Sequence, residues 1–91
     1  MNLKDIIGHL EKHCGDEDSY TIVFKEESWP MVRDKLRGKL TDMKDVAGVF
    51  IKGTYKGHEI SIFPTGRVII SGVKDDDTLI AILSEILSSP S

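Results

Sequence analysis

The chain has 91 residues, of which 40% are hydrophobic and 30% are charged, and its formal net charge at pH 7 is −3. This length predicts a single domain over residues 1–91 with one small core. No apolar run approaches the ~20 residues that span a bilayer, and the N-terminal segment lacks the long apolar stretch and the small-residue cleavage site of a signal peptide. We therefore expect a globular domain without a membrane segment.

Cysteine usage and charge distribution narrow the class further. Cys14 is the only cysteine, so an internal disulfide is excluded, which fits a reducing, cytoplasmic location. Residues 28–74 contain nine Lys or Arg against four Asp or Glu, whereas acidic residues dominate in residues 1–27 and 75–91. The negative net charge of the whole chain argues mildly against tight DNA binding. The basic middle of the chain still allows a nucleic-acid ligand.

The first half of the chain predicts two helices around one strand. Apolar residues recur at helical spacing near the start, which predicts an amphipathic helix over residues 3–13. The β-branched and aromatic residues 20–25 predict a strand. Ser28 is suited to cap a second helix with Pro30 in its first turn, and apolar residues at i, i+4 and i+8 extend that helix to a point before Asp45.

The second half predicts three antiparallel strands and a final helix. The strands are expected at residues 46–55, 58–63 and 67–72, and they are separated by a Lys-Gly turn and a Pro-Thr-Gly turn. Acidic residues 75–77 favour a helix start, and the apolar residues that follow span an arc of roughly 160° at ~100° per residue. This order predicts an α+β fold with helices on one face of an antiparallel sheet.

Apolar side chains occur on both faces of the last two predicted strands. Ile62, Val68 and Ile70 fall on one face by strand alternation. Phe63 and Ile69 fall on the opposite face among polar residues. The residues expected between the sheet and the helices are Ile60, Ile62, Val68, Ile70, Leu79, Leu83 and Ile86. The second apolar face then points to an interface.

Two short motifs stand at a set spacing before the final helix. Residues 61–67 read Ser-Ile-Phe-Pro-Thr-Gly-Arg, and residues 71–74 read Ser-Gly-Val-Lys. With the strand before them and the helix after them, residues 46–87 resemble one repeat of the TATA-box-binding protein family. In that family a long strand enters a hairpin of the type Leu-Ile-Phe-x-x-Gly-Lys, followed by a strand ending Thr-Gly-Ala-Lys. The preceding strand and helix agree in order only.

The resemblance implies a TBP-like curved antiparallel sheet of four to five strands with helices on its convex side. The concave side would lie on a widened DNA minor groove with phenylalanines wedged between base steps. By position, Phe63 resembles a wedge residue, Ser71 a groove contact, and Lys52 and Arg67 contacts to the DNA backbone. The nucleic-acid-contacting residues expected in this chain, with Phe50 added because it shares the parity of Lys52, are Phe50, Lys52, Phe63, Arg67, Ile69 and Ser71.

The chain also departs from the family pattern. Val46 stands where the family has its other wedge phenylalanine. Glu59 shares the parity of Phe63, so a carboxylate near the expected groove face would repel phosphates. The family protein has two repeats, whereas this chain has room for one. The alternative hypothesis is therefore a protein-interaction or oligomerisation module that uses the same face or a sheet edge. An unpaired sheet edge favours a two-fold homodimer.

Other residue clusters predict less chemistry. The basic residues of the second predicted helix, Arg33, Lys35, Arg37 and Lys39, are interpreted as a solvated helix face. His9, His13 and Cys14 have a spacing that zinc ligands use on a helix, but no second cysteine accompanies them. No nucleophile–base set, phosphate-binding glycine loop or paired carboxylates are evident. We expect a non-enzymatic binding module without a metal or other cofactor.

Overall fold

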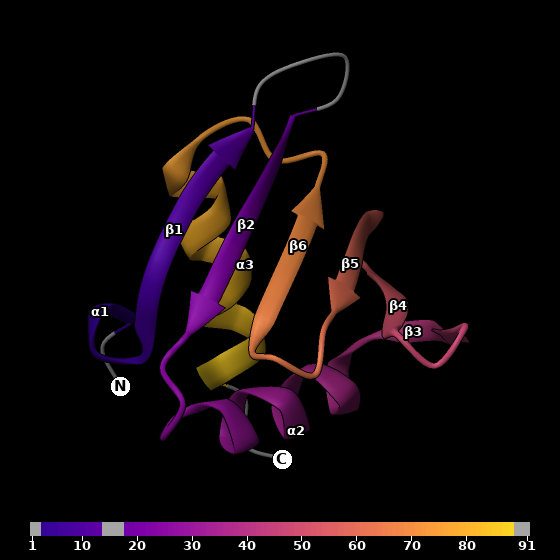
Figure 1. Cartoon of the computed structure of the whole chain (residues 1–91). Coiled ribbons are helices and arrows are strands. Elements are labelled where there is room, and N and C mark those ends of the chain that lie inside the picture. Colours follow the sequence, from indigo (N-terminus) through magenta and orange to yellow (C-terminus); the bar gives the residue numbers. More distant parts are fainter. Residues whose placement is uncertain (1–2, 14–17, 89–91) are drawn as a thin grey trace.

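The computed structural model describes residues 3–13 and 18–88 of the chain (Figure 1). Nine elements follow one another in these ranges: α1 (Leu3–Ile6), β1 (Ile7–His13), β2 (Ser19–Phe24), α2 (Trp29–Lys39), β3 (Thr41–Val46), β4 (Phe50–Tyr55), β5 (His58–Ile62), β6 (Arg67–Ser71) and α3 (Asp76–Ser88). Among the described residues, no helix has both the length and the apolar character needed to cross a membrane.

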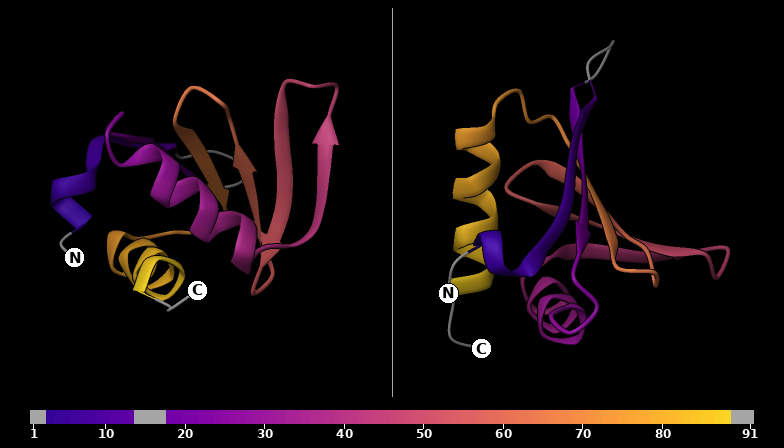
Figure 2. Two further views of the ribbon diagram at one scale, coloured as in Figure 1. Left: turned by 90° about the horizontal axis from the view of Figure 1, so that it is seen from below. Right: turned by 60° about the vertical axis from the view of Figure 1, so that its left-hand side comes forward.

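All six strands form one antiparallel sheet in the order β1-β2-β6-β5-β4-β3. Helices α2 and α3 lie on the same side of this sheet (Figure 2), which we call the covered face, and it includes Ile22, Ile60, Ile62, Val68 and Ile70. The opposite side, the open face, includes Thr21, Phe50, Lys52, Glu59, Ser61, Phe63, Arg67, Ile69 and Ser71. The α+β class is confirmed, but the sheet has six strands where four or five were expected.

The predicted helix over residues 3–13 is wrong for most of its length. Only α1 is helical, and β1 pairs with β2 so that Leu10 lies opposite Ile22 and His13 opposite Ser19. Local spacing is compatible with a helix, but ladder hydrogen bonds to β2 satisfy the backbone equally well and tertiary pairing decides. Gly8, which disfavours a helix interior, lies where the register of the pair shifts.

The predicted long strand over residues 46–55 is interrupted. Helix α2 ends at Lys39, so β3 occupies residues that were assigned to the end of that helix. A turn then joins β3 to β4, with positive φ at Ala47 (55°) and at Gly48 (71°). The Gly48 N–H donates a hydrogen bond to Asp45 Oδ1 at 2.9 Å, which stabilises this turn. The result is a hairpin that adds the sixth strand.

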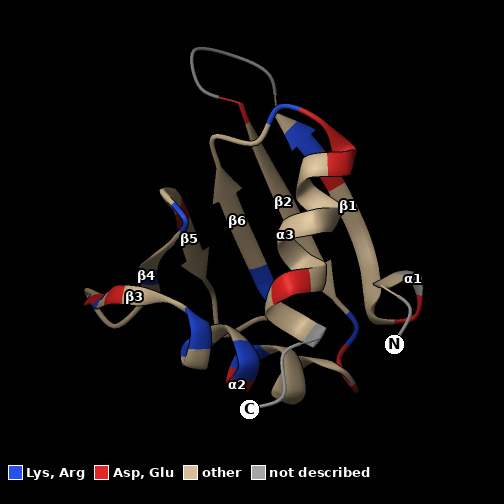
Figure 3. Ribbon diagram, turned by 180° about the vertical axis from the view of Figure 1, so that it is seen from behind, with Lys and Arg blue, Asp and Glu red and all other residues tan. Residues whose placement is uncertain are grey.

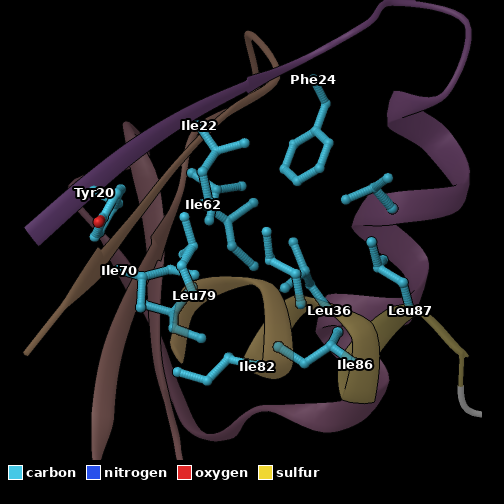
Figure 4. Packing of buried hydrophobic residues seen from close by; sticks show 14 of the residues in the cluster. Tyr20, Ile22, Phe24, Leu36, Ile62, Ile70, Leu79, Ile82, Ile86 and Leu87 are labelled. Carbon is cyan, nitrogen blue, oxygen red and sulfur yellow. The ribbon is translucent and has the colours of Figure 1, made fainter. Parts of the chain in front are cut away.

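The core lies between the covered face and the two long helices (Figure 4). The prediction for this face is confirmed, because Ile60, Ile62, Val68, Ile70, Leu79, Leu83 and Ile86 are all buried. No charged or polar side chain is buried in the described part of the chain. Tyr20 on β2 is buried, and its hydroxyl donates a hydrogen bond to Asp76 Oδ1 at 2.6 Å, which ties the sheet to the start of α3.

Candidate nucleic-acid interface

The six residues expected to contact nucleic acid all lie on the open face. Strand pairing places Lys52 opposite Ser61 and Ser61 opposite Ile69, so these residues form one row across β4, β5 and β6. Phe50 begins β4, and Phe63 directly follows β5. The sequence alternation therefore assigned Phe50, Lys52, Phe63, Arg67, Ile69 and Ser71 to the correct side of the sheet, while their contact with a ligand stays a prediction.

Phe50 and Phe63 form a stacked aromatic pair at one end of the open face. Their ring centroids are 4.9 Å apart, and their planes differ by 25°. The turn after β5 fixes Phe63, because its N–H donates to the Arg67 carbonyl at 2.8 Å and its carbonyl accepts the Gly66 N–H at 3.1 Å. Gly66 has φ of 95°, a conformation that side-chain-bearing residues rarely adopt. The hairpin turn thus sets the position of the pair.

The basic residues of the open face are partly neutralised. Lys52 forms an ion pair with Glu59, and both side chains are about half exposed. Lys44 on β3 pairs in register with Lys52, which places a second lysine beside this ion pair. These residues line a hollow of about 250 Å³ together with Asp42 and Thr54. The expected repulsion from Glu59 is therefore offset locally, and Lys52 is only partly available to a phosphate.

A second hollow, which we call the α2 cleft, was not expected from the sequence. It has a volume of about 250 Å³ and lies between α2 and the turn that joins β3 to β4, with Trp29, Arg33, Arg37, Asp45, Val49 and Phe50 among its lining residues. Arg33 and Arg37 were interpreted as part of a solvated helix face. Their spacing of one helical turn was visible in the sequence, but the partner surface depended on the unpredicted hairpin.

The zinc hypothesis for the N-terminal segment is not supported by the described residues. His9 and His13 lie on a strand, four residues and thus about 13 Å apart at ~3.3 Å per residue, so they cannot meet at one ion. His13 Nε2 is instead 2.8 Å from Thr21 Oγ1. Cys14 lies outside the described residues. Within the described ranges, no group of three or more His, Cys, Asp or Glu is arranged to hold a metal ion.

His58 also has a structural contact, since its Nδ1 is 3.1 Å from the Ser71 carbonyl oxygen. Ser71 in turn pairs with Ser19 on the neighbouring strand. Ser19 and Ser71 thus lie at the end of the open face away from the aromatic pair, whereas His58 has the strand parity of Ile60 on the covered face. Comparison with known proteins adds no assignment, because no family model, curated protein or solved structure matches the chain.

Proposed function

We propose that this domain is a nucleic-acid-binding module that uses the open face of its sheet. The observation that carries the proposal is the stacked pair of Phe50 and Phe63, two half-buried aromatic rings on the side of the sheet that no described helix covers. Aromatic rings on a sheet surface stack on bases, an interaction worth about 1–3 kcal/mol per base, or wedge between base steps. The resemblance of residues 46–87 to a minor-groove-binding repeat supports the same use of Phe63.

The charges around this pair support weak, salt-sensitive binding. Arg67 and Lys44 are exposed on or beside the open face, and Lys52 is held by Glu59. Phosphate contacts by Lys and Arg release counterions, so log affinity falls linearly with log salt. A face with few free cations and a carboxylate therefore binds at low salt and loses the ligand as salt rises.

The primary experiment measures binding of labelled duplex and single-stranded oligonucleotides at ~50 mM salt, where phosphate-driven binding is strong. Phe63→Ala is expected to weaken binding by about 5- to 160-fold, because it removes one stacking or wedging ring. Ile80→Ala is the matched control, since Ile80 is an exposed apolar residue on α3, on the other side of the sheet. Absence of binding to every oligonucleotide under these conditions would remove the proposal.

The ion pair on the open face gives a test of opposite signs. Lys52→Gln removes a cation and is expected to weaken binding, whereas Glu59→Gln removes the carboxylate, frees Lys52 and is expected to strengthen binding. If both variants change affinity in the same direction, loss of the ion pair itself is responsible, and Lys52 does not contact a phosphate.

A second candidate function is homodimer formation through the edge of the sheet at β1. β1 has a single strand neighbour in the described chain, and its residues from Leu10 to His13 pair regularly with β2. The opposite edge, β3, is interrupted by a register shift and by Asp42 at φ of 54°. Bulges discourage edge pairing, so β1 is the better edge for a second chain.

The sequence of β1 suits antiparallel pairing with itself. A two-fold axis through its central residue, Leu10, would place His9 opposite Glu11 of the second chain, and it would cover a leucine that is 40% exposed. Sedimentation equilibrium at micromolar concentration is expected to give twice the mass of one chain, and Leu10→Asp is expected to restore one chain by opposing two carboxylates. A wild-type chain that sediments only as a single copy contradicts this candidate.

A further inference from the structure

We propose that the α2 cleft binds the phosphates of a nucleic-acid strand where that strand leaves the open face. This inference rests on the proposed function and adds a second part to the interface. It assigns Arg33 and Arg37, which lie outside the sheet, to phosphate contacts beyond the few that the partly neutralised open face makes.

The two arginines lie on one flank of α2. They are one helical turn apart and both line the cleft. Lys39, on the other flank, lies close enough to Glu85 of α3 to help lower the pKa of that carboxyl, an effect that is led by the Glu85 hydrogen bond with Lys56. The basic residues of α2, visible in blue in Figure 3, thus face two different surroundings.

The cleft has an excess of positive charge that an anionic ligand would complement. Arg33 Nε is 3.9 Å from Asp34 Oδ1, a distance too long for a hydrogen bond, and both side chains are well exposed. Arg37 forms no ion pair with the residues that the structure describes. Asp45 is the carboxylate that lines the cleft, and its Oδ1 already accepts the Gly48 N–H. Guanidinium groups bind phosphate oxygens bidentately, so each of the two arginines can hold one phosphate.

The cleft is continuous with the open face through Phe50. This ring lines the cleft and also stacks on Phe63. The apolar wall is firm, because Trp29 is buried and stacks on Phe24 with ring centroids 6.0 Å apart. A volume of about 250 Å³ is below the ≈ 300–1,000 Å³ of pockets that enclose small molecules. The cleft therefore fits part of a long ligand that also occupies the aromatic pair.

The experiment compares two double variants with equal loss of charge on the same helix. Arg33→Gln/Arg37→Gln removes the cleft cations, and Lys35→Gln/Lys39→Gln removes the cations of the other flank. Affinity for the oligonucleotide that the wild-type chain binds best is measured over a series of salt concentrations. Each phosphate contact contributes ~0.7–0.9 to the steepness of log affinity against log salt. The cleft variant is therefore expected to make this negative slope shallower by about 1 to 2. The flank variant is expected to change the slope by less than half of that amount.

The outcomes separate this inference from the proposed function. If the wild-type chain binds no oligonucleotide, both fail. A second outcome is that the wild-type chain binds and Phe63→Ala weakens binding, but the two double variants have equal salt slopes. The proposed function of the open face then holds, and the proposed role of the α2 cleft is wrong. A further outcome is that the bound oligonucleotide leaves the amide resonances of Arg33 and Arg37 unchanged, whereas a poly-glutamate peptide shifts them. The cleft would then be a site for acidic protein segments, and the inference would be overturned. Thermal unfolding of both variants checks that they remain folded.

Discussion

The two faces of the same strands differ in what their residues do. Ile62 of β5 and Ile70 of β6 are buried against the helices. Phe63, directly after β5, and Ile69 of β6 are one position away from them and are only partly buried on the open face. Folding accounts for the covered face, because burial of apolar area stabilises the domain. It does not account for bulky apolar residues on the open face, and this is why we propose binding there.

The strongest test of this comparison is truncation of one isoleucine on each face. Ile62→Ala is expected to lower the free energy of unfolding by about 2–5 kcal/mol, because it leaves a cavity in the core. Ile69→Ala is expected to lower it by about 1 kcal/mol, since its side chain is only partly removed from water. Urea unfolding measures both changes, when the curves are fitted with one common slope of unfolding free energy against urea concentration.

Equal destabilisation by the two isoleucine variants would break the comparison. It would mean that the open face is covered in solution, as a second chain on that face would cover it. Leu83→Ala is a useful reference, because Leu83 of α3 is buried on the helix side of the same core. Its loss of stability should match that of Ile62→Ala and not that of Ile69→Ala.

A smaller effect is expected from an added methyl group on β4. A Cβ atom at Gly53 would lie 3.0 Å from the Leu40 Cβ and 3.1 Å from the Met43 Cγ, so neighbouring groups must move. Gly53→Ala is therefore expected to destabilise the domain by roughly 1–3 kcal/mol, as overpacking does. Thr54→Ala, at the next residue and on the opposite face, should change stability by about 0.5 kcal/mol or less. A neutral Gly53→Ala would show that the β3–β4 hairpin moves away from Leu40 easily.

Strand alternation was enough to predict the faces but not the elements around them. The faces of residues 60–70 could be assigned, because a shift of the strand register by one residue would expose all the apolar side chains of the covered face. Residues 7–13 could not, because their apolar spacing suits a helix and their strand state depends on β2. The turn at Ala47 was also missed, since a non-glycine residue at positive φ leaves little local signal.

The candidate site was predictable to the same extent. The open-face residues follow from alternation alone, so Phe50 and Phe63 were placed on one side correctly. Their mutual stacking was not predicted, because it depends on the register between β4 and β5. The α2 cleft was beyond sequence reasoning, because its second wall is the hairpin that had been assigned to a helix end and a long strand. The residue types of the cleft were visible in the sequence, but the long-range contacts that bring them together were not.

The smallest expected effect concerns how α3 is held on the covered face. The Thr78 N–H donates to Asp75 Oδ1 at 2.7 Å, and this bond, with a weaker one from the Thr78 side chain, lowers the pKa of Asp75 below its ordinary value of 3.8. A lowered pKa in the folded state means that the carboxylate stabilises the fold in full well above pH 3.8 and that this contribution disappears as pH falls through the folded value.

Asp75→Asn separates charge from capping, because asparagine still caps a helix but does not titrate. The melting temperature of the variant should fall less steeply with pH below 3.8 than that of the wild type, while the two proteins differ little at neutral pH. Some acid sensitivity should remain, since the ion pair with Lys56 also lowers the pKa of Glu85. Both carboxylates fix α3, so acid should loosen the packing of α3 on the covered face. Parallel melting curves for the variant and the wild type across the acid range would contradict a stabilising charge at the start of α3.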